Sequence, residues 1–296
     1  MSIRLIVPYV AGGGSDQRAR LVARHLERHI GEKIEVVNRT GAVAGHMAIA
    51  EAPADGSVIG LITGEIGMMH WHAGLTPLAP KDYTPLAVPY VESAAVIVAA
   101  SAPWRTAREF LDEFSRRKIT GSGGPHFGVW KFALAGLLDV AGIPTSQLEW
   151  TETLSGEQGL EHVLAGRADV APITMTDARH AISSGKARAL VTMEDRRHPR
   201  FADVPTVDEA LGRRWSVAHW RGLVGPKGLP AAVGERFVSA LRKVADDAGF
   251  RREAAANSFT VRWRFGADFA SYMDEDDRQF GRVIRLLEEG ASSCAH

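Results

Sequence analysis

The chain has 296 residues, 45% of them apolar, a size that suits two domains or one large soluble domain. Its 35 basic and 35 acidic side chains cancel, so neither nucleic acid nor an anionic membrane surface is expected as a partner. The single cysteine, Cys294, excludes a disulfide within the chain and argues against a cysteine-based metal site or nucleophile. No apolar run reaches the roughly 18 residues that span a bilayer, so no direct membrane insertion is expected.

The first elements predict a strand, a glycine loop and a helix. Ile3–Val7 is a short apolar run of the kind that forms a buried strand. Gly12–Gly14 follow, and Ser15 or Asp16 can cap the amphipathic helix behind them. Such a turn directs free backbone amides and the positive end of a helix dipole at one point, so it can hold an anion. The alternative, a tight connection in which glycine only fits the backbone angles, stays equally open.

The alternation continues through the first half of the chain. Lys33–Asn38 and Val58–Ile62 are expected strands, and a loop over 39–46 leads into a helix over 47–52. Strands that alternate with helices predict a parallel sheet, and ligands of such sheets bind beyond the carboxyl ends of the strands. Gly12–Ser15, Gly41–His46 and Thr63–Glu65 are therefore expected to meet at one edge.

The stretch between 67 and 91 loses its periodicity and is expected to be a loop. It contains His70 and His72, but this pair lacks a nearby carboxylate or cysteine and favours packing or surface over a metal site. Ala94–Ala100 is an apolar strand of the kind that links two domains.

The second half repeats the opening pattern. A helix over 107–117 and a strand ending at Ile119-Thr120 lead into a second glycine-rich loop, Gly121–Gly128, and a largely buried helix over 129–140. The later expected elements are helices over 157–164 and 176–184, strands over 168–173, 187–192 and 218–226, and a helical remainder that includes 267–289. The strand over 218–226 is expected to return to the first domain.

Enzyme signatures are missing from the sequence. The glycine loops match neither the dinucleotide fingerprint nor a phosphate loop, and there is no nucleophile elbow or His-Glu-x-x-His motif. The acidic pairs Glu194-Asp195 and Asp276-Asp277 favour solvated surface over paired catalytic carboxylates. No catalytic residue, metal ligand or cofactor is therefore predicted.

Several sequence blocks resemble one known family. They are Pro8–Asp16, Val37–Ala42, Ala54–Gly56, Lys81–Pro85, Asp203–Thr206 and Trp220–Leu223, and their order and approximate spacing match from about residue 3 to residue 288. These blocks resemble the substrate-binding receptors of tripartite tricarboxylate transporters, also called the Bug family.

The resemblance implies a fold and a partner. The expected fold is α/β and two-lobed, of the periplasmic binding protein type II-like class, with a mainly parallel sheet flanked by helices in each lobe and a ligand cleft between the lobes. Residues 1–101 with 223–296 would form lobe 1, and 102–222 lobe 2. The implied protein is a monomeric, non-enzymatic receptor that closes by a hinge over a small carboxylate and passes it to the membrane components of the transporter. A periplasmic location is implied; no leader precedes the first strand, which leaves a cytoplasmic ligand sensor as an alternative.

The resemblance also implies which residues meet the ligand. Carried over by position, they are Tyr9, Ala11, Gly12, Gly13, Gly14, Ser15, Asp16, Thr63 and Trp220 in or beside one lobe, with Gly121, Ser122, Gly123 and Gly124 in the other. His126 is a further candidate, because it or neighbouring Trp130 would stack on an aromatic acid; Trp130 as plain core is an equal alternative. A hydrolase that uses Ser15 or Ser122 beside His126 is the enzymatic alternative.

One departure from the family pattern concerns the ligand's charge. Members often carry an acidic residue where this chain has Ile173 and Thr174. An apolar Ile173 removes the partner that an ammonium group needs on leaving water, so we expect a ligand without an amine, either a dicarboxylate or tricarboxylate or an aromatic acid.

Overall fold

The computed structural model describes residues 2–67, 76–124 and 128–293. The chain forms two compact units: unit 1 contains Met1–Val91 and Trp220–Gly281, and unit 2 contains Glu92–His219 and Arg282–His296. The lobe boundaries expected from the sequence, 1–101 with 223–296 and 102–222, stay a prediction.

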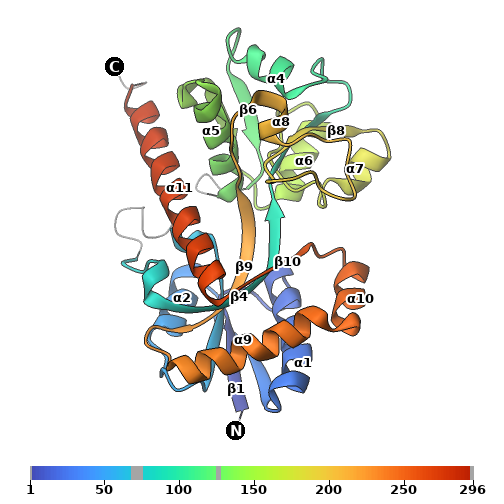
Figure 1. Ribbon diagram of the computed structural model, residues 1–296. Helices are drawn as coiled ribbons and strands as arrows, with labels where there is room; N and C mark the ends of the chain where they lie inside the picture. Colours follow the sequence, from blue (N-terminus) through green and yellow to red (C-terminus); the bar gives the residue numbers. More distant parts are fainter. Residues whose placement is uncertain (1, 68–75, 125–127, 294–296) are drawn as a thin grey trace. The chain divides into compact units, whose positions relative to one another are not determined.

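Unit 1 is built on a six-stranded sheet with the strand order β10-β4-β9-β3-β1-β2 (Figure 1). The strands are β1 (Ser2–Val7), β2 (Lys33–Asn38), β3 (Val58–Thr63), β4 (Tyr83–Ser93), β9 (Ala218–Pro226) and β10 (Val261–Phe265). β1 pairs in parallel with β2 and β3, as the alternating pattern predicts. β9 runs antiparallel to β3, and β10 antiparallel to β4, so the whole sheet is mixed.

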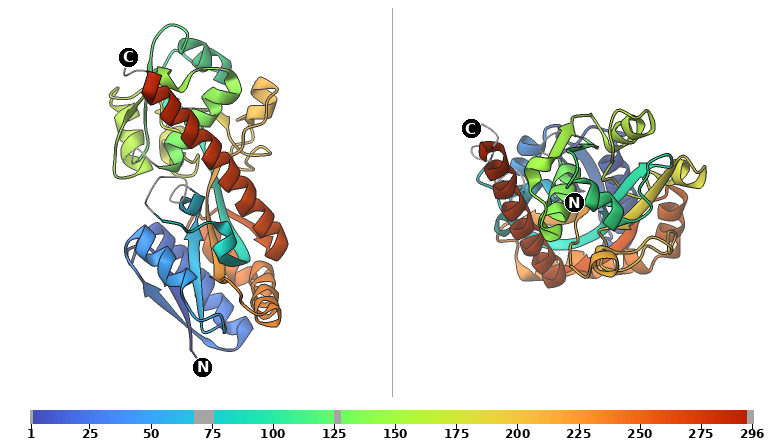
Figure 2. Two further views of the ribbon diagram at one scale, coloured as in Figure 1. Left: turned by 90° about the vertical axis from the view of Figure 1, so that its left-hand side faces the viewer. Right: turned by 90° about the horizontal axis from the view of Figure 1, so that it is seen from above.

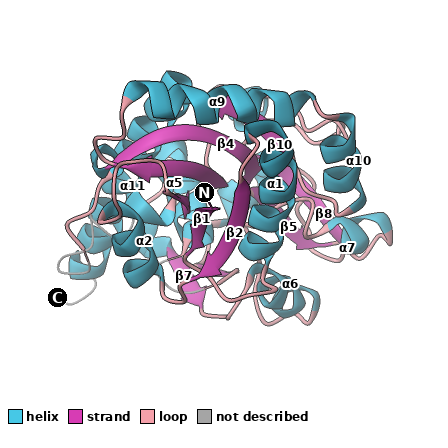
Figure 3. Ribbon diagram, turned by 90° about the horizontal axis from the view of Figure 1, so that it is seen from below, coloured by secondary structure: helices cyan, strands magenta, loops and turns pink. Residues whose placement is uncertain are grey.

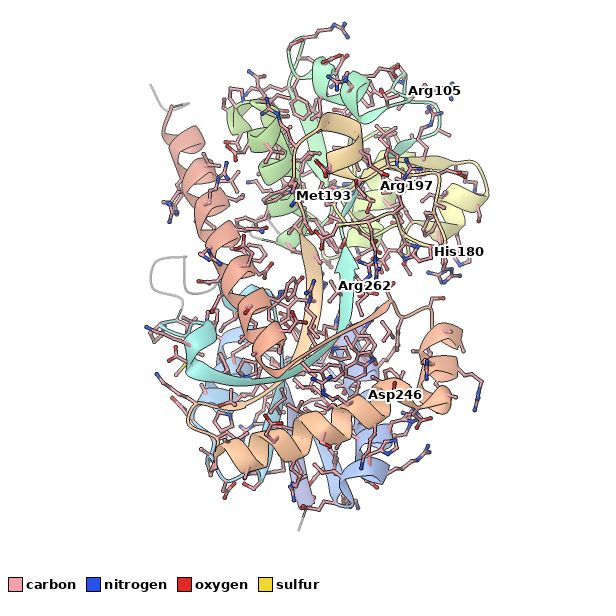
Figure 4. The ribbon with its side chains drawn as sticks, viewed as in Figure 1. Arg105, His180, Met193, Arg197, Asp246 and Arg262 are labelled. Atoms are coloured by element: carbon pink, nitrogen blue, oxygen red, sulfur yellow. The ribbon has the colours of Figure 1, made fainter. Side chains whose placement is uncertain are left out.

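Helices cover both faces of this sheet (Figures 2 and 3). The helices are α1 (Gly14–Ile30), α2 (Ala42–Ala50), α9 (Ala231–Asp246), α10 (Ala248–Ala256) and the first part of α11 (Gly266–Ser293). Alternate residues of β1, such as Leu5, share one core with Leu26 of α1, Phe237 of α9 and Phe250 of α10. The opposite face receives α2, whose Ile49 lies over β3. α9 ends at Asp246, which Figure 4 labels, and Asp247 then caps α10.

Unit 2 contains two small strand pairs. β5 (Ala95–Ala99) runs antiparallel to β8 (Ala187–Thr192), and β6 (Ile119–Ser122) runs parallel to β7 (Leu148–Thr151). The helices of this unit are α4 (Ala107–Glu113), α5 (Val129–Ala141), α6 (Gly156–Leu164), α7 (Arg179–Ser183) and α8 (Val207–Leu211), with the end of α11. Val163 of α6, Ala181 of α7 and Ile173, which lies between these helices, pack against β5 in one buried cluster.

The expected strand over 168–173 is wrong. Within that stretch only isolated bridges form, from Val170 to Gly121 and from Ala171 to Ile97. The stretch is apolar because it is buried between two strand pairs, and an apolar run alone does not distinguish a ladder from a buried connection.

Two strands of unit 1, β4 and β10, are not predicted from the sequence. β4 begins at Tyr83, inside the stretch expected to be a loop. Its sequence does not indicate a strand, because it contains Pro85 and Pro89 and proline cannot donate to a ladder. β10 lies inside the stretch expected to be helical. It has only five residues, and two of them are arginines.

The helix α2 begins at Ala42, five residues earlier than expected. Small residues are typical of a loop, but here they allow close packing: a Cβ on Gly45 would lie 2.6 Å from Cα of Pro8. The helix can approach the β1–α1 loop only because Gly45 has no side chain.

Candidate functional site

The first glycine loop of unit 1 leads directly into α1. β1 ends at Val7, and the N-cap of α1 is Gly13, which is extended and makes no side-chain capping bond. The expectation that Ser15 or Asp16 caps the helix is therefore wrong: both lie in its first turn, because Gly13 already takes the capping position. The first amides of a helix have no acceptor within it, which leaves those of Gly14, Ser15 and Asp16 as donors for a ligand.

Asp16 ties this loop to the helix. Its Oδ2 accepts hydrogen bonds from the Gly12 amide at 2.7 Å and Arg20 Nε at 2.8 Å, and its Oδ1 accepts from Asn38 Nδ2 at 2.9 Å. Burial alone would raise the pKa of Asp16, but these hydrogen bonds outweigh it and hold the pKa below its usual range. The amide of Gly13 donates to the Val10 carbonyl, so the predicted Gly12 and Gly13 amides are already bonded inside the loop. Ala11 lies beside them and is exposed.

A closed ring of hydrogen bonds joins the ends of β1 and β3. Tyr9 Oη donates to Glu65 Oε2 at 2.9 Å and lies 2.8 Å from Thr63 Oγ1, which in turn accepts from the Glu65 amide at 3.3 Å. Because the single phenol proton goes to Glu65, the Thr63 hydroxyl donates to Tyr9. Burial, with the charge of Glu65, raises the pKa of Tyr9 well above its usual range and keeps the phenol neutral.

Arg221 brings a positive charge to the same place. It stands opposite Thr63 in the β3–β9 pair, so both side chains lie on the face that α1 covers. It is buried, and its Nε donates to Ser15 Oγ at 3.1 Å, in the first turn of α1. The sequence reasoning missed Arg221 and left Glu65 off the candidate residues, although a single arginine within the apolar stretch 217–226 is a signal that could have found the former.

Trp220, the neighbouring candidate, points to the other side of β9. It is fully buried, and its Nε1 donates to Asp276 Oδ2 at 2.7 Å beside the ring of Phe269. Asp276 is therefore not the surface residue expected from the sequence, and burial raises its pKa to about 8. Glu194, of the other acidic pair, is also buried; both expectations failed because an acidic doublet does not reveal which member faces a core.

The second glycine loop belongs partly to a strand. Gly121 and Ser122 are the last residues of β6, and the Ser122 amide donates to the Val170 carbonyl. The Ser122 hydroxyl donates to the Thr151 carbonyl at 3.0 Å and lies 3.3 Å from His162 Nδ1. Because Ser122 is fully buried, it has no exposed hydroxyl for a nucleophilic role.

The rest of the second loop lies against Ile173. Gly123 and Gly124 follow β6, and Gly124 O accepts from Trp150 Nε1 at 3.2 Å. A Cβ on Gly123 would lie 3.4 Å from Ile173 Cγ2, so the loop and the apolar Ile173 are neighbours. The adjacent Thr174 is also buried, and its hydroxyl accepts from the Asp177 amide at 2.9 Å.

Lys131 is a further residue near this loop. It lies in the first turn of α5, where a cation opposes the helix dipole, and it is nearly fully buried. Burial lowers its pKa to about 8, which the charge of Glu152 partly offsets. Trp130 next to it is half-buried and meets the ring of His219 edge to face. The candidate His126 lies outside the described residues.

Metal binding finds no support in the described ranges. No group of three or more His, Cys, Asp or Glu in residues 2–67, 76–124 and 128–293 is arranged to hold an ion. His70 and His72 lie outside these ranges. In the same part of the chain, the helices are all too short or too polar to cross a bilayer.

Comparisons with known proteins bear on the family and the fold of the chain. A relative from Pseudomonas sp. (strain P51), the UPF0065 protein in the tcbD-tcbE intergenic region, is 28% identical over 81% of this chain and 73% of its own length. A TctC solute binding protein from Polaromonas superposes with a TM-score of 0.88 at 26% identity, covering 96% of this chain and 98% of that one.

Two more distant structures share the fold. They are MatC from Rhodopseudomonas palustris with bound malate, at a TM-score of 0.74 and 21% identity, and Rpa4515 from R. palustris with adipate, at 0.75 and 18%. The alignments cover 96% of this chain in both, with 98% of the first structure and 96% of the second.

These likenesses confirm the predicted α/β, two-lobed class of periplasmic binding proteins. The family model described as "Tripartite tricarboxylate transporter family receptor" matches residues 18–288. The chain belongs to that receptor family.

Proposed function

We propose that this protein is an extracytoplasmic receptor that binds a small carboxylate and delivers it to the membrane components of a tripartite tricarboxylate transporter. The observation that carries the proposal is the start of α1, where first-turn amides lie beside the buried guanidinium of Arg221. Amides and a helix dipole favour an anion, and a guanidinium adds charge-assisted hydrogen bonds. Family membership and the malate and adipate of the related structures support the same ligand class.

The proposed contacts in unit 1 centre on the first turn of α1. Gly14, Ser15 and Asp16 would offer amides, and Tyr9 and Thr63 would border the ligand through their hydroxyls. Gly12 and Gly13 would shape the loop and Ala11 would lie at its rim. Trp220 would support Arg221 from behind the sheet.

The proposed contacts in unit 2 begin two residues later along the chain than the sequence suggests. Gly123 and Gly124 would offer amides, while Gly121 and Ser122 anchor them as strand residues. Ile173 and Thr174 would face the part of the ligand away from the carboxylate, and His126 is kept as a proposed neighbour.

The ligand is proposed to lack an amine. The buried Ile173 beside Gly123 offers an ammonium group no acceptor, and leaving such a cation unpaired away from water is costly. Dicarboxylates, tricarboxylates and aromatic acids satisfy this condition. Aspartate and glutamate do not.

Native mass spectrometry of the purified protein tests the proposed function. We expect a retained small carboxylic acid that dissociates on collisional activation and is identified by its mass. As a control, the protein unfolded and refolded without ligand should have the bare chain mass and regain the adduct with the identified acid. A retained nucleotide, sugar or amine in place of an acid would contradict the proposal.

A further inference from the structure

The hydrogen-bond ring in unit 1 uses its hydroxyl protons internally. The Tyr9 hydroxyl donates its only proton to Glu65 Oε2 at 2.9 Å, and the Thr63 hydroxyl, 2.8 Å from Tyr9 Oη, donates its own to Tyr9. Thr63 Oγ1 also accepts from the Glu65 amide at 3.3 Å. The ring therefore has no hydroxyl proton left to donate to a ligand.

The ring does keep an acceptor, Oε1 of Glu65. Within the part of the chain that the structure describes, this oxygen makes no hydrogen bond, because the contacts of Glu65 are those of Oε2 and the backbone amide. Burial raises the pKa of Glu65, while the hydrogen bond from Tyr9 and the charge of Arg221 act in the opposite direction and favour the ionised form. An ionised carboxylate only accepts, and taking it from water without a donor is costly. A ligand atom that covers Oε1 should therefore carry a proton to donate.

The ring lies beside the proposed position of the ligand carboxylate. Arg221 stands opposite Thr63 in the β3–β9 pair, and its Nε donates to Ser15 Oγ at 3.1 Å in the first turn of α1. The charge of Arg221 acts on both Tyr9 and Glu65, so the ring and the start of α1 belong to one cluster. A carboxylate at the first-turn amides would have its neighbouring carbon atom next to the ring.

The group on that carbon decides how well the ring is satisfied. A methylene has no proton to donate, so it would leave Oε1 of Glu65 without a partner. An ammonium group would be attracted by Glu65 but repelled by the guanidinium of Arg221 and by the positive end of the α1 dipole. A hydroxyl donates a hydrogen bond and adds no charge, and it is the group that fits best.

We propose that Glu65 is a specificity-determining residue of unit 1 that selects α-hydroxy carboxylic acids: the ligand hydroxyl donates to Glu65 Oε1 while the adjacent carboxylate binds at the first-turn amides of α1. The inference rests on the proposed function and narrows its ligand class to acids with a hydroxyl on the carbon next to a carboxylate. A site built to bond a ligand hydroxyl rejects the analogue that lacks it, because its own polar group is then left unpaired.

The test is calorimetric titration of the full chain with pairs of acids that differ only by this hydroxyl. The pairs are malate and succinate, α-hydroxyadipate and adipate, and mandelate and phenylacetate, so that ligands of different length and character are covered. Aspartate, the amine counterpart of malate, is added. Titration at about pH 8 keeps ordinary carboxyl groups ionised.

We expect the hydroxy acid to bind more tightly than its partner in every pair that binds. The difference should be about 10- to 100-fold, as for a hydrogen bond to a charged group. Malate should also bind more tightly than aspartate.

Two variants of Glu65 separate selection from a structural role. Glu65→Met has a similar length and no acceptor, so the hydroxy acid should lose affinity and its partner should lose none, which brings the preference toward onefold. A merely structural role would weaken both members of a pair alike. Glu65→Gln keeps an uncharged acceptor for Tyr9 and should show an intermediate preference, which keeps the proposal testable if Glu65→Met unfolds. Glu35→Gln, on the exposed side of β2, should keep the preference of the natural chain.

The outcomes distinguish the two proposals. Equal affinities within the pairs that bind, an unchanged preference in both Glu65 variants, or binding only of acids without the hydroxyl would overturn the inference and leave the receptor function standing. Tighter binding of aspartate than of malate would overturn the inference and the proposed absence of an amine. Failure of these acids and of every other small carboxylate to bind would overturn the proposed function as well.

Discussion

Single residues of unit 1 carry chemistry that their sequence neighbours do not reveal. Tyr9 and Thr63 are candidates from the sequence, but Glu65, which closes their ring, and Arg221, which holds Ser15, come from strands and turns far apart in the chain. A glycine loop before a helix predicts where amides gather. It does not predict which side chains the neighbouring strands bring to them, because that depends on register.

Replacing Arg221 tests its part in binding. Arg221→Gln should weaken malate and adipate binding by about 10- to 100-fold, since a charge-assisted hydrogen bond contributes about 1.5 to 3 kcal/mol. Titration calorimetry measures the effect, and Arg28→Gln on the exposed side of α1 is the matched control. Equal affinities of the two variants would show that Arg221 is only a structural contact of Ser15.

Asp276 gives a prediction about stability. Its pKa is about 8 in the folded chain against 3.8 as the reference, so between these values the folded state holds a proton that the unfolded state lacks. Stability therefore falls as pH rises through this window. Asp276→Asn keeps an acceptor for Trp220 and loses the penalty, so it should be more stable by about 1 to 3 kcal/mol near pH 8.

Urea unfolding at several pH values measures this difference. It should shrink as pH falls to 3.8 and below, where the natural side chain becomes protonated in the unfolded state as well. Asp274→Asn, exposed on the same helix, is the control and should change little. A stability gain that does not vary with pH would contradict the assignment to Asp276.

Whole elements follow the sequence where their pattern is undisturbed. β2, β8 and β9 have the bounds expected from the sequence. α2 and β4 do not have the expected bounds. Their small residues and prolines are typical of loops, and the local sequence does not show the tertiary contacts in which these residues form a helix and a strand. The positions of the two glycine loops were also predicted from the sequence. The sequence did not show that Gly121 and Ser122 belong to a strand, whereas Gly123 and Gly124 belong to the loop.

A buried histidine, His25, contributes to the contact between α1 and α10. His25 Nδ1 lies 2.8 Å from Asp247 Oδ2, and Nε2 lies 3.1 Å from Glu253 Oε1. Carboxylates accept only, so a ring nitrogen that carries a proton donates to the carboxylate beside it. Hydrogen bonding from His25 is the largest cause that lowers the pKa of Asp247.

Replacing His25 should therefore loosen these two helices. His25→Ala leaves a cavity and removes one partner each from Asp247 and Glu253, and should destabilise the chain by about 2 to 4 kcal/mol. Thermal and urea unfolding measure it, with the exposed His180→Ala, labelled in Figure 4, as control. The natural chain should also lose stability as acid protonates Asp247, since its folded pKa is depressed. A loss of stability in His25→Ala no larger than that in His180→Ala would contradict the role of His25 in holding the two helices together.

At the scale of the whole molecule, the chain has the fold of the receptor family to which it belongs. We propose that this receptor responds to ligand by hinge closure, in which a few residues between two rigid bodies absorb the motion. The proposed receptor is also expected to be a monomer.

Small-angle scattering tests hinge closure and the monomer together. Saturating malate or adipate should reduce the radius of gyration, and the scattering mass should equal one chain with and without the acid. Glutamate at the same concentration serves as the control. An unchanged radius in the presence of a carboxylate that calorimetry shows to be bound would contradict closure.

The most direct measurement is titration calorimetry of the natural chain against a panel of malate, adipate, citrate, benzoate, aspartate and glutamate. A carboxylate receptor without an acceptor for an amine should bind at least one amine-free acid tightly, and more tightly than either amino acid. Tight binding of aspartate or glutamate alone, or of no acid in the panel, would contradict the proposed function.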